Sequence, residues 1–488
     1  MRSRLAAPLL FASLLAPATA AARVRCRTQD VRLERAAYLA YAGESDRPAS
    51  VGFVDSDVYP IRVHYRSDAD ADRAADVVVP SAELAWEAQV DGMGWPTPPA
   101  DGGLGGDDRF DLYLTNEDTE GGAWTWGPLR DVTPSDDWYS VASFVALDDR
   151  WITDADMSEF VVHEFNHALQ FTLDGQEQTL FVWESIAEAM EELVLPDSDL
   201  YFLDIPDFQA LPFASLLFDG YSQEVEAYNS YSYYEYGGSI VGLYLEHAYG
   251  QSDGTTLLQL WLDLAQGSAS AEPDYVDALG GIGGATDPTY EDVYLGLAEW
   301  RMFVADDDDG AHFAEGARWG RGSKVATEGT LTLSMVDGTT VSPTDPPYDL
   351  GTSYWEIEVD DAVGGLLHLE LDGEDTVEWG IVAAAWLDGA PARVVRARGD
   401  AGETASLDLD LTGATQVMVA VANFGGPDLD AEARHPREDF TLGFARDEAA
   451  DTDSGDTDSV DSDDRNPFFE KLLSDTQRPI SSHTNEGS

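Results

Sequence analysis

The sequence VVHEFNHALQ occupies residues 161–170 and places two histidines, His163 and His167, four positions apart. On an α-helix, residues four apart lie on one face, so both imidazoles can reach a single metal ion. Glu164 follows the first histidine, where its carboxylate can contact a water at the metal without binding the metal itself. A chain with only 8 histidines rarely contains this spacing by chance. We therefore expect a helix over residues 154–173 that carries a zinc site.

A third ligand is expected on the next helix, because catalytic zinc usually has three protein ligands and an open position. Over residues 181–195, Glu184 and Glu188 are again four positions apart. One carboxylate can bind the metal while the other accepts a hydrogen bond from the second ring nitrogen of a ligand histidine. The alternative is a solvated acidic face, because Glu191 and Glu192 follow. Beside the histidine pair, we favour the metal ligand.

The two motifs, at residues 163–170 and 183–188, resemble those of the gluzincin metallopeptidases, the clan of thermolysin and the alanyl aminopeptidases. They are also similar to a myxobacterial family of secreted metalloproteases, and that likeness extends over most of residues 51–445. The resemblance implies a zincin-like fold and zinc-dependent hydrolysis of peptides. It further implies that Glu184 is the third zinc ligand and that Glu188 is the acid that supports a ligand histidine.

Several tyrosines lie just before or at the start of an expected helix over residues 236–249: Tyr231, Tyr233, Tyr234 and Tyr236. Residues 234–237, YEYG, resemble the Tyr-Glu-Lys-Gly of gluzincin aminopeptidases, whose tyrosine donates a hydrogen bond to the oxyanion. The lysine of that motif is missing here. The resemblance implies Tyr234 as the donor, with Tyr236 as the next candidate. Aromatic packing at the start of a helix explains the same residues equally well.

The expected reaction is hydrolysis of a peptide bond by an activated water. Zinc lowers the pKa of its water to about 7. Glu164 then takes the proton as hydroxide attacks the carbonyl, and later passes it to the leaving amine. We expect the substrate to add a strand to the edge of a sheet near residues 139–147, a stretch rich in Val, Ala and Phe.

The order of the remaining segments predicts an α+β unit followed by an all-β unit. Expected strands lie at residues 60–65, 110–114 and 139–147, and further expected helices lie at residues 81–92, 255–265 and 290–304. Strands followed by helices suit an α+β unit over residues 51–322, and the resemblance to gluzincins implies that this unit is a zincin-like metallopeptidase domain. Residues 323–447 contain short apolar runs separated by turns rich in Gly and Asp, which are typical of a β-sandwich.

Both ends of the chain differ in composition from a folded core. Residues 1–20 combine two arginines, a short apolar stretch and a small-residue cleavage site, the layout of a secretory signal peptide. Residues 21–50 are expected to be a leader or propeptide. Residues 448–488 begin with a Thr/Asp/Ser repeat and are expected to be an acidic, disordered tail. We therefore expect a secreted or cell-envelope protein without a membrane span.

The net charge is −66, from 27 basic and 93 acidic residues. This balance argues against nucleic-acid binding, which needs clustered Lys and Arg, and against docking on anionic membranes. It suits a soluble, self-repelling surface in a salty environment or one containing calcium. The Asp-rich loops of the sandwich could hold Ca²⁺, although no EF-hand spacing is present. The single cysteine excludes an intrachain disulfide.

Two other functions remain compatible with the sequence. The first is an exported binding or adhesion protein that acts through its sandwich and keeps a structural or relic zinc site. Glu164 argues against it, because a structural site does not require a base. The second is a zinc hydrolase whose substrate is not a peptide. The sequence distinguishes neither the natural substrate nor endo- from exo-cleavage.

Overall fold

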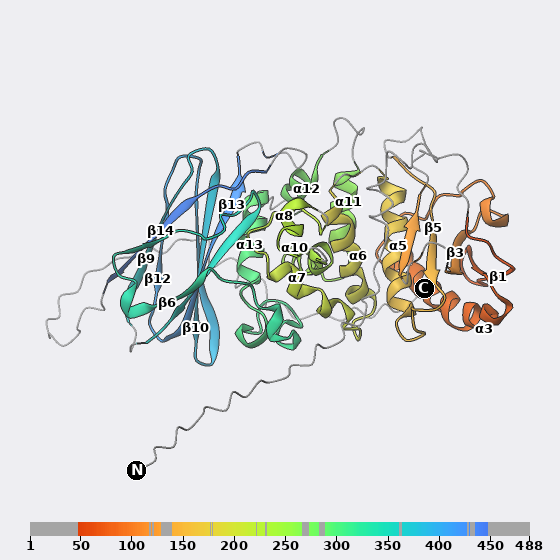
Figure 1. The fold of residues 1–488 in the computed structure, drawn as a ribbon, viewed down its shortest axis with the longest axis horizontal. Helices are drawn as coiled ribbons and strands as arrows, with labels where there is room; N and C mark the ends of the chain where they lie inside the picture. Colours follow the sequence, from red (N-terminus) through yellow and green to blue (C-terminus); the bar gives the residue numbers. More distant parts are fainter. Residues whose placement is uncertain are drawn as a thin grey trace, which may run out of the picture. The chain divides into compact units, whose positions relative to one another are not determined.

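The computed structural model describes residues 47–116, 119, 122–127, 139–175, 177, 179–220, 222–229, 232–265, 273–282, 288–360, 364–426, 429 and 435–447. The expected signal peptide, nearly all of the expected leader, the acidic tail and Tyr231 lie outside these residues. The described chain mixes helices with several β-sheets and is rich in strands towards its C-terminal part (Figure 1). The predicted α+β composition is thereby confirmed.

The first sheet has the strand order β1-β2-β3-β5-β4. Its strands are β1 (Gly52–Asp55), β2 (Ile61–Tyr65), β3 (Phe110–Thr115), β4 (Ala123–Trp126) and β5 (Phe144–Asp148). Strands β2, β3 and β5 run parallel, whereas β4 runs antiparallel to β5. The expectation of an edge strand near residues 139–147 is wrong, because β5 lies between β3 and β4. The edge belongs to β4, which hydrogen-bonds to a described strand on one side only.

A helical segment follows β2 and runs through Pro80 instead of starting after it. It consists of α3 (Ala71–Arg73), a π-helix (Ala74–Val78), α4 (Val79–Trp86) and a second π-helix (Glu87–Gly92). The wide π-turn directly before α4 accommodates the proline, which cannot donate the usual backbone hydrogen bond. Ser81 therefore lies inside the helical segment and not at its start, and its hydroxyl donates to Val77 O. This segment packs against α5.

The helices α5 (Met157–Leu173) and α6 (Leu180–Val194) agree closely with the two expected central helices. Helix α5 lies against β4 and β5 on one side and against α6 on the other. Its apolar residues Val161, Val162, Phe165 and Leu169 are fully buried. Because α5 is covered on nearly all sides, its polar residues also lose contact with water and need partners inside the protein.

The other helices follow in sequence and pack around α6 and towards the C-terminal sheets (Figure 1). They are α7 (Ile205–Gln209), α8 (Gln223–Glu226), α9 (Tyr234–Gly237), α10 (Ser239–Tyr249), α11 (Thr255–Leu264), α12 (Tyr275–Gly281) and α13 (Tyr290–Trp300). Helix α13 begins at a capping box between Thr289 and Asp292. No helix in the described part of the chain combines the length and the apolar character that crossing a bilayer requires.

Two further sheets form the C-terminal part, with orders β11-β10-β13-β8-β6 and β12-β9-β14-β7. Their strands are β6 (Gly329–Thr332), β7 (Thr339–Val341), β8 (Gly351–Glu358), β9 (Leu366–Gly373), β10 (Glu378–Leu387), β11 (Ala390–Gly399), β12 (Ala405–Asp410), β13 (Ala414–Gly425) and β14 (Phe440–Asp447). One hydrophobic cluster joins apolar residues of both sheets, as in a β-sandwich.

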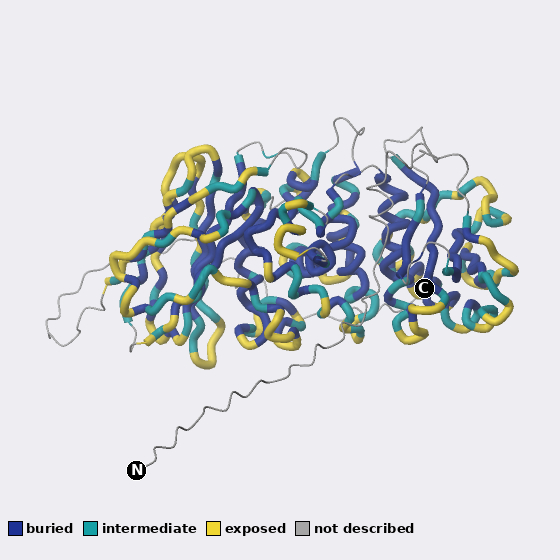
Figure 2. Tube along the Cα trace, in the orientation of Figure 1, coloured by how far each residue is buried: buried dark blue, intermediate teal, exposed yellow. Residues whose placement is uncertain are grey.

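The central strands β8, β10 and β13 of the five-stranded sheet are buried along most of their length (Figure 2). Along β10, Ile381 and Ala383 belong to the cluster between the sheets, whereas Val382 and Ala384 belong to the core of the helical part. Helix α13 packs on this second face, where the Tyr294 hydroxyl lies 2.8 Å from Thr352 Oγ1. Burial on both faces explains the continuous Ala/Val runs of β10 and β13. The expected domain boundary between residues 322 and 323 stays a prediction.

Candidate metal centre

Three buried side chains from α5 and α6 converge on one point. His163 Nε2 lies 3.1 Å from His167 Nε2 and 3.2 Å from Glu184 Oε2, and His167 Nε2 lies 3.4 Å from the same oxygen. The histidines are one turn apart on α5, and Glu184 faces them from α6. The structure thus brings together all three residues expected to bind the metal.

The separations match those of ligands around one small ion. Two atoms that are each about 2.0–2.1 Å from an ion lie about 3.3–3.4 Å apart at the tetrahedral angle. The three observed separations, 3.1 to 3.4 Å, fall close to this value. Two imidazole nitrogens and one carboxylate oxygen are also a common donor set for catalytic zinc. The residues present therefore fit a zinc ion.

The charge and burial of Glu184 support the same conclusion. The side chain is fully buried, and its Oε1 atom makes no hydrogen bond to any residue that the structure describes. Burial raises the pKa of Glu184, but the imidazoles of His167 and His163 outweigh this and hold it below its usual range. A buried carboxylate that stays charged calls for a positive partner at this point.

The second ring nitrogens of both histidines have acceptors that orient the rings. His163 Nδ1 donates to Glu191 Oε1 at 2.9 Å and lies 3.3 Å from Glu188 Oε2. His167 Nδ1 donates to Gln170 Oε1 at 2.7 Å, and the Gln170 amide donates in turn to a backbone carbonyl on α6. These contacts leave both Nε2 atoms available to a metal, as is usual for metal-binding histidines.

The sequence interpretation missed Glu191 and Gln170. The sequence offers a solvated face as the alternative for Glu191, yet this side chain is only 8% exposed. A signal was present, since Glu191 lies seven positions after Glu184 and three after Glu188, on the same face of α6. Burial raises the pKa of Glu191, while burial and the neighbouring Glu191 raise the pKa of Glu188 to about 8.

Glu164 is fully buried and is contacted by the edge strand β4. Thr125 Oγ1 lies 2.6 Å from Glu164 Oε2 and 2.7 Å from the Glu164 backbone oxygen. A short contact from a hydroxyl to a carboxylate fixes the position of the carboxylate group. No feature of the sequence marked Thr125, because its proximity to Glu164 results from the antiparallel return of β4 along the sheet edge.

The structure does not bring Tyr234 to this centre. Its hydroxyl donates to the carbonyl oxygens of Ala214 and Ser215, at 3.1 and 3.0 Å, and the side chain is fully buried. The ring of Tyr236 instead stacks on the ring of His163, with centroids 6.1 Å apart. Tyr234 and Tyr236 share the single turn of α9, where positions two apart point in roughly opposite directions. Only one of them can therefore face α5.

Within the described ranges, two clusters of at least three His, Cys, Asp or Glu residues could hold a metal ion, and both include His163. They are His163–His167–Glu184 and His163–Glu188–Glu191. The second uses the other ring nitrogen of His163 and belongs to the same centre. The expectation of Ca²⁺ in the sandwich loops stays a prediction.

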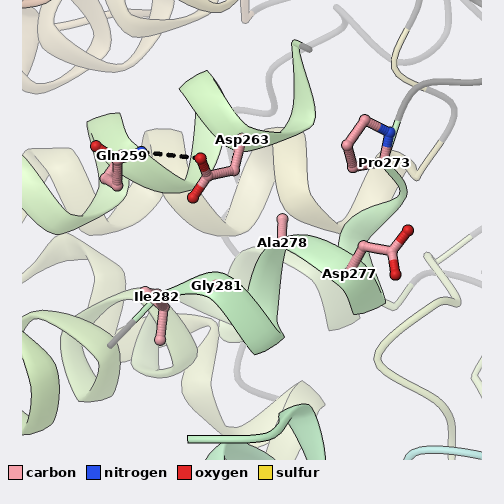
Figure 3. A pocket seen from close by; sticks show the side chains of 7 residues that line it. All are labelled: Gln259, Asp263, Pro273, Asp277, Ala278, Gly281 and Ile282. Carbon is pink, nitrogen blue, oxygen red and sulfur yellow. Dashed lines mark hydrogen bonds between the residues drawn. The ribbon is translucent and has the colours of Figure 1, made fainter. Parts of the chain in front are cut away.

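A shallow pocket of about 500 Å³ lies elsewhere, between α11 and α12 (Figure 3). Gln259 and Asp263 line its α11 side, where the Gln259 amide donates to Asp263 Oδ1 at 2.9 Å. None of the expected site residues lines this pocket. It is separate from the candidate metal centre.

Comparison with known proteins gives no assignment. The sequence matches no protein-family model and no curated protein. The pre-peptidase C-terminal domain of collagenase from Bacillus anthracis is 11% identical, covers 24% of this chain and 96% of its own, and gives a TM-score of 0.18. PliG, a periplasmic inhibitor of g-type lysozyme from Aeromonas hydrophila, is 11% identical over 24% of this chain and 99% of its own, with a TM-score of 0.16. Scores this low do not establish a shared fold.

Proposed function

We propose that the protein is a zinc-dependent peptidase with His163, His167 and Glu184 as metal ligands and Glu164 as the general base. The observation that carries the proposal is the convergence of two imidazole nitrogens and one carboxylate oxygen within 3.1–3.4 Å of one another. The adjacent glutamate distinguishes this set from a purely structural zinc site. When bound, zinc supplies Lewis acidity, which polarises a carbonyl group and makes a nearby water more acidic.

The residues around the centre have separate tasks in this proposal. Glu164 accepts a proton from the attacking water and returns it to the leaving amine. Thr125 holds the Glu164 carboxylate through the 2.6 Å contact to Oε2. Glu191 and Gln170 hold the two imidazole rings with their Nε2 atoms towards Glu184. Tyr236 replaces Tyr234 as the candidate donor to the oxyanion, because its ring stacks on His163.

The proposed fold is zincin-like, with a peptide substrate bound along β4. Strand β4 is antiparallel to its neighbour, forms the sheet edge and carries Thr125. An extended peptide can add to such an edge through main-chain hydrogen bonds. Because Thr125 contacts Glu164, a peptide on the outer side of β4 would lie near the proposed base. Residues 1–20 further support export, since they have the composition of a signal peptide.

The proposal is tested by digesting casein and a peptide library with the wild type, Glu164→Gln and chelator-treated protein. Zinc content is measured in parallel by elemental analysis. We expect one zinc per chain in the wild type and in Glu164→Gln, with cleavage by the wild type alone. Loss of a general base typically lowers the rate about 10²–10⁴-fold. Readdition of zinc should restore cleavage to the chelated wild type.

A structural or relic zinc site in a binding protein is the second candidate. It is favoured by the burial of the centre, since His167, Glu164 and Glu184 have no exposed surface. Full zinc occupancy without cleavage of any peptide by the wild type would support this candidate and reject the peptidase. Absence of bound zinc would reject both.

A further inference from the structure

A second recess, of about 720 Å³, opens where the N-terminal turn of α5 meets the C-terminal end of α6. Leu84 of α4, residues 194–200 and Leu203 line it together with residues from the start of α5. The recess is distinct from the metal ligands, none of which lines it. Its size is that of a ligand site, and it is much larger than the space that one ion occupies.

The walls of the recess are apolar and reach the surface. Leu84 is 36% exposed and Leu203 is 53% exposed, so both belong to the large apolar side chains that this protein leaves in contact with water. Leu195 and Leu200 extend the same surface. Apolar side chains at the mouth of a recess favour a ligand with an aliphatic portion.

The charged residues that line the recess are all acidic: Asp156, Glu159, Asp197 and Asp199. Glu159 of α5 lines it and is only 6% exposed. No hydrogen bond or ion pair to the Glu159 carboxylate occurs within the described part of the chain. Other buried glutamates of this protein have such partners: Glu191 contacts His163, and Glu299 pairs with Arg396. The Glu159 oxygens are not cut off from solvent, so a cation that enters the recess can reach them and pair with the carboxylate.

The electrostatic surroundings of Glu159 disfavour its charged form as long as no cation lies in the recess. Burial, followed by repulsion from Asp156, Glu188 and Asp199, raises the pKa of Glu159 to about 8. A nearby cation, Arg318, is half exposed and pairs with Asp199 at 2.7 Å. Arg318 therefore neutralises Asp199 and forms no ion pair with Glu159 within the described part of the chain.

An inorganic cation fits the recess poorly. Among the described residues, no three carboxylate or imidazole groups of this recess approach one another closely enough to bind one ion together. Leucines at the mouth also offer no ligand to a metal. A cation on an aliphatic stem satisfies both parts of the site, because its stem packs on leucine while its charged end reaches the acid.

We propose that this recess binds the side chain of a lysine or arginine residue of a peptide. The aliphatic stem lies against Leu84 and Leu203, and the charged end pairs with Glu159. The inference concerns binding alone and does not depend on the proposed catalytic function. Glu159 precedes His163 by one turn of α5, so a peptide held here is anchored about 6 Å along the helix from the metal centre.

The experiment measures binding of fluorescent pentapeptides to the full chain by anisotropy, with intact peptide verified by mass spectrometry. The peptides are Gly-Gly-X-Gly-Gly, in which X is lysine, arginine or norleucine. Norleucine keeps the aliphatic stem and lacks the charge. We expect the lysine and arginine peptides to bind at least tenfold more tightly than the norleucine peptide. Equal binding of all three would overturn the proposal.

Two variants test the location of binding. Glu159→Gln should weaken binding of the lysine peptide at least tenfold. Ser198→Lys, on the loop wall, should weaken it similarly by placing the protein's own ammonium group in the recess. The matched control is Glu370→Gln, which makes the same substitution at an exposed position on β9 and should leave affinity within twofold. Similar losses in Glu159→Gln and Glu370→Gln would show general attraction to an acidic protein and overturn the assignment.

Ser198→Lys keeps the test decisive if Glu159→Gln does not fold, because it leaves the buried acid unchanged. Unaltered affinity in a folded Ser198→Lys protein would reject the recess as the site. Free cadaverine serves as a competitor to identify the source of the cation. Displacement of the lysine peptide by cadaverine at equal concentration would assign the recess to small amines instead of peptide side chains.

Discussion

Glu191 Oε1 lies 2.9 Å from His163 Nδ1, whereas Glu188 Oε2 lies 3.3 Å from the same nitrogen. The residue three positions beyond the expected acid is therefore the closer acceptor. Both carboxylates are buried, and their shared contact with one ring nitrogen fixes the orientation of His163. The orientation matters because the opposite nitrogen, Nε2, faces His167 and Glu184.

Replacement of Glu191 by Gln should lower zinc affinity about 10–100-fold. This is the usual effect of losing the carboxylate that accepts a hydrogen bond from the second ring nitrogen of a metal-binding histidine. Glu188→Gln should have a smaller effect, because its oxygen is farther from Nδ1. Affinity is measured by competition with a chromophoric chelator. Glu192→Gln is the control, since it changes the adjacent glutamate without touching His163. A larger loss in Glu188→Gln than in Glu191→Gln would contradict the assignment.

Removal of the metal should destabilise the wild type but not a variant that lacks the third ligand. A ligand that binds only the folded state stabilises it by about 4 kcal/mol at a thousandfold excess over Kd. Chelation should therefore lower the Tm of the wild type, measured by calorimetry at pH 7. In Glu184→Ala the Tm should be the same with and without chelator. A chelator-sensitive Glu184→Ala protein would place the metal elsewhere.

Thr125→Val should reduce kcat/KM about 10–100-fold while zinc content stays at one per chain. The substitution keeps the shape of the side chain and removes the hydroxyl 2.6 Å from Glu164 Oε2. A hydrogen bond to a charged group contributes about 1.5–3 kcal/mol, which corresponds to that range of rates. Thr172→Val, which removes a buried hydroxyl that donates to Ala168 O within α5, should retain activity. Equal losses in both variants would indicate a general effect on packing.

The two tyrosines of α9 should respond differently to loss of the hydroxyl. Tyr236→Phe should lower kcat with little change in KM or Tm, because the residue stacks beside the centre. Tyr234→Phe should instead lower the free energy of unfolding by about 1–3 kcal/mol, since it leaves the carbonyls of Ala214 and Ser215 without their donor. Denaturant titration and steady-state kinetics separate the two effects. The reverse pattern would restore Tyr234 as the oxyanion donor.

The raised pKa of Glu159 predicts that the free energy of unfolding depends on pH. Burial and neighbouring acids raise its pKa from 4.5 to about 8, so the folded protein keeps a proton that the unfolded chain loses. The free energy of unfolding therefore falls as pH rises from about 4.5 to about 8. Glu159→Gln removes this contribution and should be more stable than the wild type at pH 8, by about 1–3 kcal/mol, and similar at pH 4.5. Glu370→Gln is the control. A pH-independent difference would show that Glu159 is not the group responsible.

The sequence alone was sufficient where local periodicity carries the information. The spacing of His163 and His167 places both side chains on one helical face whatever surrounds the helix. The same reasoning applies to Glu184 and Glu188 on α6, and to the α+β composition with its strand-rich C-terminal part. These features depend on residues within a few positions of one another, and backbone geometry fixes their relation.

Only the tertiary structure decided which groups from distant segments meet. Strand order placed β4, and not β5, at the sheet edge, and so brought Thr125 to Glu164. Packing of α6 against α5 buries Glu191 beside His163. Helix α9 is oriented so that the ring of Tyr236, and not that of Tyr234, stacks on His163. Helix packing and strand order depend on how apolar surfaces are buried together across the whole chain. A pattern read along one segment does not contain that information.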